Sequence, residues 1–145
     1  MGDRKTTKHN PNIVRVALAI VRNRDRWLVN RRLAPDALHG LWEFPGGKMR
    51  SDETATETAV RECLEEVAIE VDPYAALRMR IHHGYTGPVR LYPVLCRLVG
   101  GTAEPAEGKI GPVRWVDLDE LQSLAMPPAN QAIIAELAAR SKPLT

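Results

Sequence analysis

The sequence predicts a single α/β or α+β domain with a mixed β-sheet. Segments of strand character and of helical character alternate along the chain, and no internal repeat or low-complexity segment is present. The 145 residues are 44% hydrophobic, which is enough for one proper core. A net charge of +2 gives little attraction toward nucleic acid or an anionic membrane.

The first elements are strands. Residues 13–21 are apolar with little interruption, and 27–29 follow after the polar turn 23–26, which predicts a buried β-hairpin. A third short strand is expected at 41–44, where the chain runs into Pro45 and two glycines. A loop is expected after these glycines.

A helix is expected over residues 55–67. Thr54 and Glu57 have the spacing of a capping box, in which a hydroxyl and a carboxylate satisfy the first free N–H groups of the helix. At 100° per residue, four side chains of this segment fall within an arc of about 100° and are expected to face the core. They are Val60, Cys63, Leu64 and Val67.

The second half of the chain reads as strands followed by helices. Strands are expected at 77–83 and 89–99, joined by a loop that contains glycine and proline. Pro93 weakens the second of these strands at its centre, because proline cannot donate a ladder hydrogen bond. Three further elements complete the chain: a short strand at 113–116, a short helix through Leu124 capped by Asp117 or Asp119, and a last helix from Pro127-Pro128 through Ala139.

The acidic residues are concentrated in one segment. Residues 52–70 hold seven carboxylates and one basic residue, Arg61, which is expected to bridge Glu57 and Glu65 beside the acidic patch. Three glutamates share an arc of about 100° on the predicted helix, roughly 140° from its apolar stripe. They are Glu62, Glu65 and Glu66. Clustered carboxylate oxygens suit a hard divalent cation such as Mg²⁺.

An acidic helix face is in most proteins simply solvated surface. Here Gly46 and Gly47 precede the helix, and glycines allow a ligand to approach the backbone closely beside the carboxylates. The combination indicates a site for a metal ion and a phosphate group.

The spacing of this segment resembles the Nudix box. Gly47 is followed after five residues by Glu53 and after seven more by the run Arg61–Ile69, in which the charged positions of the box all recur. Two positions depart from the pattern. Cys63 stands where an aliphatic residue is usual, and Ala68 replaces the terminal glycine, at a cost of about 1 kcal/mol if that position is left-handed.

The resemblance extends over nearly the whole chain, since residues 31–32, 41–48 and 127–130 are similar to segments of MutT-type Nudix hydrolases. It implies an α/β/α sandwich in a single domain over 12–142, after a flexible tail at 1–11. It also implies hydrolysis of a nucleoside triphosphate to the monophosphate and pyrophosphate. The expected metal is Mg²⁺, with Mn²⁺ as a substitute, and the expected substrates are oxidised purine nucleotides such as 8-oxo-dGTP.

The resemblance also implies the roles of individual residues. Metal ligands would come from Glu62, Glu65, Glu66 and a backbone carbonyl of Gly46 or Gly47. Substrate contacts would come from Arg32, Glu43, Phe44, Pro45 and Asn130, with Arg32 on phosphate or sugar and Asn130 on the base edge. The general base would be Glu62 or Glu65, with Glu107 as a third candidate.

Other functions stay open from the sequence. Residues 40–44 also resemble hydrolases of CTP or 5-methyl-CTP, and Tyr85 lies where dinucleoside polyphosphate hydrolases carry a tyrosine. A non-catalytic Nudix-like binding module is a further alternative, but it predicts eroded carboxylates. Two cysteines without metal-type spacing favour a reducing compartment, so a cytoplasmic protein with a small-molecule nucleotide substrate is expected. Stable binding to nucleic acid or membranes is not expected, and the oligomeric state is left open.

Overall fold

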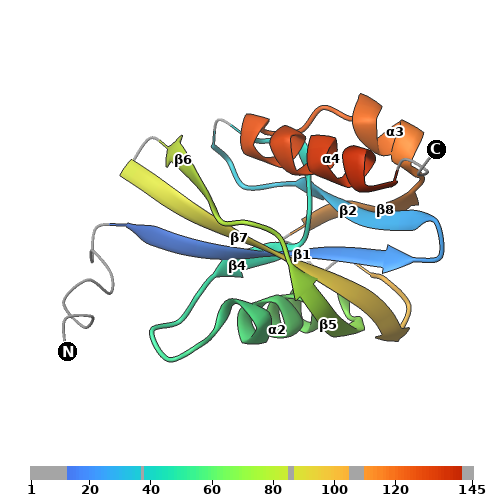
Figure 1. Cartoon of the computed structure of the whole chain (residues 1–145), viewed down its shortest axis with the longest axis horizontal. Helices are drawn as coiled ribbons and strands as arrows, with labels where there is room; N and C mark the ends of the chain where they lie inside the picture. Colours follow the sequence, from blue (N-terminus) through green and yellow to red (C-terminus); the bar gives the residue numbers. More distant parts are fainter. Residues whose placement is uncertain (1–12, 37, 85–86, 105–109, 142–145) are drawn as a thin grey trace.

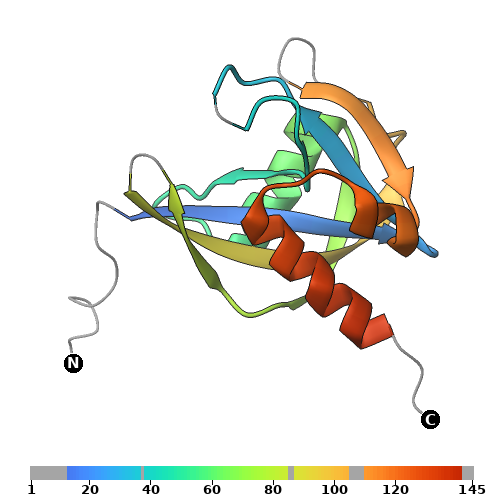
Figure 2. The ribbon, with the colours of Figure 1, turned by 90° about the horizontal axis from the view of Figure 1, so that it is seen from above.

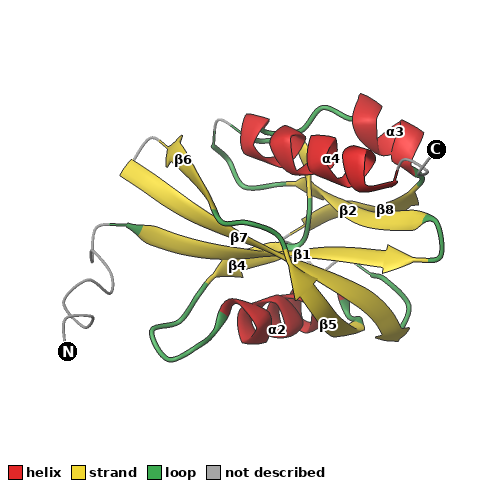
Figure 3. Ribbon diagram, viewed as in Figure 1, coloured by secondary structure: helices red, strands yellow, loops and turns green. Residues whose placement is uncertain are grey.

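The sheet is mixed and has helices on both faces, as Figures 1 and 3 show for the computed structural model. The structure describes residues 13–36, 38–84, 87–104 and 110–141. Helix α2 covers one face, and helices α3 and α4 cover the other. The predicted α/β/α sandwich is therefore confirmed. No described helix is long and apolar enough to span a membrane.

Strand β1 (Val14–Asn23) lies at the centre of the sheet. It runs parallel to β7 (Gly87–Gly100) and antiparallel to its other partners. The main path of the sheet is β3-β2-β1-β7-β5, with β4 paired to β1, β6 to β7 and β8 to β2. The predicted first hairpin is confirmed as β1 and β2 (Arg26–Arg32), and β3 is limited to Trp42–Glu43.

Strand β4 (Gly46–Lys48) was not predicted, because a loop was expected after the glycines. Its residues have little β-propensity, so the pairing with β1 holds them extended: Leu18 lies opposite Gly46, and Ala17 opposite Gly47. The glycines that precede α2 are thus part of the sheet.

The strands around Pro93 also differ from the sequence expectation. Strand β5 (Glu70–Ala76) was missed, and β6 is Arg80–Gly84, shorter than the predicted 77–83 at its start. Pro93 lies inside β7, at the point where β7 exchanges its partner β6 for β5. A missing N–H is tolerated there because the ladder is already interrupted.

Helix α2 spans Ala55–Val67 with the predicted capping box between Thr54 and Glu57. The predicted core face is wrong in part, because the side chains of Val60 and Leu64 are exposed. The helix buries its ridge of small side chains instead, and this lets its axis approach the sheet closely. The ridge is formed by Ala59, Cys63 and Val67, all fully buried.

The other face of the sheet is covered by α3 (Leu118–Ser123) and α4 (Pro128–Ser141), which lie side by side across it in Figure 2. Asp117 caps α3 by accepting a hydrogen bond from the backbone N–H of Glu120, which decides between the two predicted caps. Strand β8 (Ile110–Val116) leads into this region. Two core clusters result, one on each face of the sheet.

Candidate active site

The two glycines of β4 lie directly against α2. The backbone N–H of Gly46 donates to Oε1 of Glu66 at 3.2 Å. Neither glycine has room for a side chain. A Cβ on Gly46 would lie 2.3 Å from the carbonyl oxygen of Ala17, and a Cβ on Gly47 would lie 2.6 Å from the carboxylate of Glu62. Glycine at these positions therefore brings the backbone into contact with the carboxylates of the helix.

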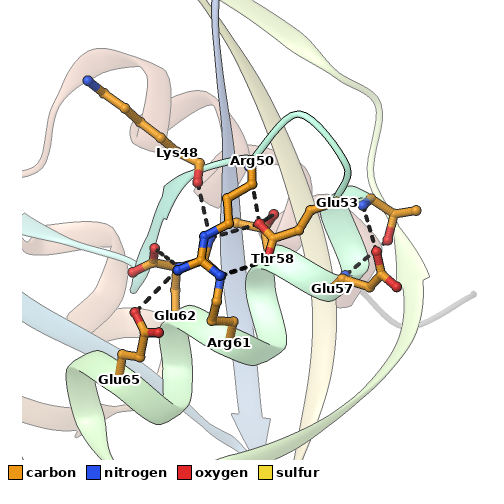
Figure 4. Close-up of polar contacts among 9 residues, drawn as sticks. Lys48, Arg50, Glu53, Glu57, Thr58, Arg61, Glu62 and Glu65 are labelled. Carbon is orange, nitrogen blue, oxygen red and sulfur yellow. Dashed lines mark hydrogen bonds and ion pairs between the residues drawn. The ribbon is translucent and has the colours of Figure 1, made fainter.

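Arg61 holds the acidic residues around it, as Figure 4 shows. Its Nε and Nη2 donate to the two carboxylate oxygens of Glu53 at 2.6 and 2.8 Å. Its Nη1 donates to Glu62 at 2.8 Å and to Glu65 at 3.4 Å. A further bond reaches the backbone carbonyl of Lys48 in β4 at 3.2 Å. One guanidinium thus ties the loop, the strand and the helix together.

These contacts correct one expectation. Arg61 bridges Glu62 and Glu65, not Glu57, whose carboxylate is used in the capping box. Glu53 holds Arg61 in place through two hydrogen bonds. Glu53 also accepts hydrogen bonds from the hydroxyl of Thr58 and the backbone of Arg50.

The surroundings of Glu53 lower the pKa of its carboxyl group to about 2. The hydrogen bonds from Arg61 are the main cause, and burial opposes them. Glu53 is therefore a permanently charged brace for the loop before α2.

Glu66 has the opposite character. Burial is the main cause that raises its pKa to about 8, and the neighbouring Glu62 adds to the shift. The N–H of Gly46 lowers the pKa, while the charge of Glu43 raises it further. The structure thus places a half-buried carboxyl group, Glu66, next to Glu62, whose own cationic partner is Arg61.

Glu62 and Glu66 fit a divalent cation, because a positive ion would remove the cost of two neighbouring carboxylates. Glu65 is different: its side chain is 52% exposed and contacts Arg61. Within the described residues, no group of three His, Cys, Asp or Glu side chains is arranged to hold a metal ion. The expected convergence of three glutamates is therefore seen for two of them. The candidate Glu107 lies outside the described residues.

Arg32 lies at the end of β2 and contacts two carboxylates. Its Nη2 bonds Asp36 at 2.7 Å and its Nη1 bonds Glu43 at 3.3 Å. Burial raises the pKa of Glu43, and Arg32 opposes this shift. The charge of Glu43 also raises the pKa of Glu66. Arg32 and Glu43 therefore lie close enough to the carboxylates of α2 to interact with them electrostatically.

Asp36 was not predicted from the sequence. Its exposed position in the loop after β2 gives no signal except the i, i+4 spacing from Arg32. A second missed residue is Asn30, which is 2% exposed and lies opposite Glu43 in the sheet. Its Oδ1 is buried and has no hydrogen-bond partner within the described part of the chain.

The other predicted substrate residues lie on the α4 side of the sheet. Phe44 is fully buried in the core cluster of this face, and Pro45 beside it is also buried. Asn130 lies in the first turn of α4 and is 5% exposed. Its side-chain amide can both donate and accept a hydrogen bond. Asn130 and Phe44 thus belong to one face, and the carboxylate helix to the other.

Ala68 ends α2 in the left-handed conformation, with φ 58° and ψ 36°. Its backbone N–H bonds the carbonyl oxygens of Cys63 and Leu64, which closes the helix. The position therefore has the geometry for which glycine is preferred.

A glycine pair packed against a carboxylate helix, under a mixed sheet with helices on both faces, defines the Nudix class of hydrolases. Residues 16–136 match the NUDIX domain family. The chain belongs to this family, in its MutT-like, 8-oxo-dGTP diphosphatase-like branch, and is a Nudix pyrophosphohydrolase. Nudix hydrolases act on nucleotide substrates and typically depend on a divalent metal.

Known proteins of similar length support this assignment. The chain is 31% identical to the 8-oxo-dGTP diphosphatase of Escherichia coli, over 86% of this chain and 95% of that protein. It is 34% identical to the 8-oxo-dGTP diphosphatase of Haemophilus influenzae, over 86% and 91%. The crystal structure of the MutT protein from Methanosarcina mazei Go1 has the same fold, with a TM-score of 0.79 at 22% identity, covering 90% of this chain and 96% of that one.

Proposed function

We propose that this enzyme hydrolyses an oxidised purine nucleoside triphosphate, of the 8-oxo-dGTP type, to the nucleoside monophosphate and pyrophosphate in the presence of Mg²⁺. One water molecule is consumed, and one phosphate anhydride bond is broken. The observation that carries the proposal is the pair Glu62 and Glu66 packed against the glycines of β4. The likeness to the 8-oxo-dGTP diphosphatases of Escherichia coli and Haemophilus influenzae supports the substrate class.

Glu62 and Glu66 are the residues that would hold the ion, with a backbone carbonyl of Gly46 or Gly47. When bound, the ion would neutralise the polyphosphate and make a coordinated water more acidic. Arg61 already fixes Glu62 by a hydrogen bond of 2.8 Å, so this ligand is oriented before the ion arrives. Glu65 is half exposed and can turn from Arg61 toward the substrate.

The general base is Glu62 or Glu65, and Glu107, outside the described residues, stays the third candidate. Both Glu62 and Glu65 accept a hydrogen bond from Nη1 of Arg61, which holds them beside the glycines of β4. The bond to Glu65 is the longer one, at 3.4 Å, so Glu65 is less constrained. The variants Glu62→Gln and Glu65→Gln separate the two roles. Loss of the base should lower kcat, whereas loss of a ligand should raise the Mg²⁺ concentration needed for half-maximal rate.

The nucleoside would lie on the α4 side of the sheet, where Phe44 would provide an apolar wall and Asn130 a side-chain amide. Arg32, held between Asp36 and Glu43, would contact phosphate or sugar. The amide of Asn130 can donate and accept at once, as reading a purine edge requires.

A substrate panel tests the reaction. It compares 8-oxo-dGTP, dGTP, CTP, 5-methyl-CTP, ADP-ribose and diadenosine polyphosphates by kcat/KM, with Mg²⁺ and with EDTA. We expect 8-oxo-dGTP to have the highest value and EDTA to abolish turnover. A higher value for a cytidine nucleotide would overturn the purine assignment, and turnover in EDTA would overturn the metal dependence.

Base recognition has a test of its own in Asn130→Ala. We expect the preference for 8-oxo-dGTP over dGTP to fall by about 10-fold, because a paired polar contact contributes on the order of 1–2 kcal/mol. Gln122→Ala, which removes an exposed amide from α3, is the matched control and should leave the preference unchanged. An unchanged preference in Asn130→Ala would remove this residue from the base pocket.

A further inference from the structure

A second concave site lies away from the candidate active site. It consists of two adjoining cavities of about 410 and 360 Å³, which share Arg22 and Tyr74 in their walls. These volumes lie in the range of pockets that bind small ligands. We call this site the arginine groove, and define it by six of its lining residues: Arg22, Arg24, Trp27, Tyr74, Arg97 and Arg140.

The arginine groove lies at the end of the sheet where β1 turns into β2. Arg22 pairs with Trp27 across this hairpin, whereas β4 contacts β1 at Ala17 and Leu18. Four residues of extended strand separate Leu18 from Arg22, which is roughly 13 Å. One of the cavities is also walled by the C-terminal end of α4, on the face opposite α2 (Figure 1). The groove is thus distinct from the site on α2.

The charge of the groove is uniformly positive. Four of its lining residues are arginines, and neither cavity has a carboxylate in its lining. Within the described chain, Arg22 and Arg24 have no carboxylate oxygen within 4.0 Å, although Asp25 lies in the same turn. Unpaired cations grouped in one concavity repel each other, so an anion would stabilise them.

The other two arginines have only weak partners. Arg97 is 3.8 Å from Asp72, with both side chains more than 60% exposed, and such pairs contribute little. Arg140 is 3.8 Å from Glu136, whose carboxylate also binds Arg80 in β6. All four guanidinium groups therefore retain donors for a ligand.

Two of these guanidinium groups are held in place by aromatic rings. Arg22 lies over the ring of Trp27 at 5.1 Å, and Arg97 over the ring of Tyr74 at 4.3 Å. Nε of Arg22 also donates to the carbonyl oxygen of Arg24 at 2.7 Å. A stacked guanidinium keeps its N–H edge free and loses less side-chain freedom on binding. Two of the arginine side chains are thus preorganised for binding a ligand.

We propose that the arginine groove is a second, non-catalytic binding site for a diphosphate group, either free pyrophosphate or the phosphate chain of a nucleotide. Several guanidinium forks around a small cavity match the many oxygens of a diphosphate, because each fork can donate two parallel hydrogen bonds to two oxygens of one phosphate group. A single monovalent anion would leave most of these donors unused. The proposal does not depend on which nucleotide the active site cleaves.

The test is a titration of the ¹⁵N-labelled full chain in EDTA, followed by NMR. Inorganic pyrophosphate, a nucleoside diphosphate and sulfate are added in separate arms. We expect saturable shifts at the amides of Asn23, Arg24 and Leu98, which line the groove, with pyrophosphate binding at least about 10-fold more tightly than sulfate. Tighter binding of the nucleoside diphosphate would identify a nucleotide as the ligand, and equal binding would identify the diphosphate alone.

The decisive variant is R22Q/R97Q, in which we expect pyrophosphate to bind at least about 10-fold more weakly while 8-oxo-dGTP turnover is unchanged. The control R26Q/R78Q removes the same charge from exposed positions outside the groove lining and should bind within about twofold of the wild type. R22K/R97K keeps the charge but not the fork and should be intermediate. Equal weakening in both glutamine variants, or no saturable shifts at the groove, would overturn the proposal. Absence of turnover in every protein would overturn the proposed function alone.

Discussion

Glu53 and Glu66 are two carboxylates at the two ends of one candidate site, and their surroundings shift their pKa values in opposite directions. Glu53, in the loop before α2, receives four hydrogen bonds, and its pKa falls to about 2. Glu66, on the last turns of α2, is half-buried beside Glu62, and its pKa rises to about 8. The first carboxylate has its cation inside the protein, in Arg61. The second needs a cation from outside.

This contrast separates structural from functional carboxylates within one acidic segment. A carboxylate that is saturated by internal donors braces the fold and has no capacity left for a ligand. A carboxylate that is buried without a cation costs stability, and such groups cluster at functional sites. Three experiments test this contrast, and a fourth tests the end of the helix that carries Glu66; the first has the greatest expected effect and the last the smallest.

Glu66→Gln should change activity most. Removing the buried charge should lower 8-oxo-dGTP turnover by about 1,000-fold while the fold is retained, because the variant loses a metal ligand and no structural partner. Turnover and circular dichroism measure the two quantities. Glu57→Gln is the control, since glutamine also serves in a capping box, and it should keep full activity. Full activity in Glu66→Gln would place the metal elsewhere.

The stability of the metal-free protein should depend on pH in a stated direction. The folded pKa of Glu66, about 8, lies above the ordinary value of 4.5, so the folded state binds the extra proton between these values. Stability should therefore fall as pH rises from 5.5 to 8.5, by about 3 kcal/mol at most, and Glu43 adds in the same direction. Thermal unfolding in EDTA measures this slope. Glu66→Gln should remove most of the dependence of stability on pH. An equal slope in both proteins would contradict the raised pKa of Glu66. Glu53 acts the other way, since its stabilisation is lost only below pH 4.5.

Arg61→Gln tests the braced side of the comparison. It leaves the metal ligands in the chain but removes the group that orients Glu62, so the Mg²⁺ concentration for half-maximal rate should rise by about 10- to 100-fold. Arg50→Gln is the control, because its side chain is exposed and lies 4.0 Å from Glu53. An unchanged requirement for Mg²⁺ in Arg61→Gln would mean that Arg61 serves stability only.

Ala68→Gly should have a small effect, confined to stability. The left-handed backbone at this position costs alanine about 1 kcal/mol, so glycine should raise the melting temperature by about 3 °C. Ala135→Gly, in the middle of α4, is the opposite control and should lower it, because glycine weakens a regular helix. Activity should stay the same in both variants. A lower melting temperature in Ala68→Gly would contradict the assigned strain.

The sequence predicted the extent of α2, and its start most firmly, because the local chemistry of the capping box sets that end. It did not predict β4, whose extended backbone depends on the distant strand β1 and not on its own residues. The prediction of which α2 side chains face the core was wrong in part for a similar reason. Periodicity favoured the large side chains of Val60 and Leu64, but the closeness of the sheet selected the small ones.

The same limit applies to the candidate site. Spacing along a helix identified the three glutamates, yet it could not show that Arg61 would take Glu62 as a partner. Nor could it show that the charge of Glu43 acts on Glu66, since this interaction depends on how the sheet places β3 relative to α2. The arginine groove was invisible for this reason as well, because its residues come from strands and a helix far apart in sequence.

The parallel pairing of β1 with β7 has a consequence for how the enzyme is made. Val14 pairs with Val89, so the parallel partner of β1 lies 75 residues further along the chain (89 − 14). Contacts of such separation form late, because closing a long loop is entropically costly. The glycines of β4 are held by β1, so their position against the carboxylate helix is fully supported only when β7 lies beside β1. Affinity for metal should therefore reach its full value only with the completed sheet.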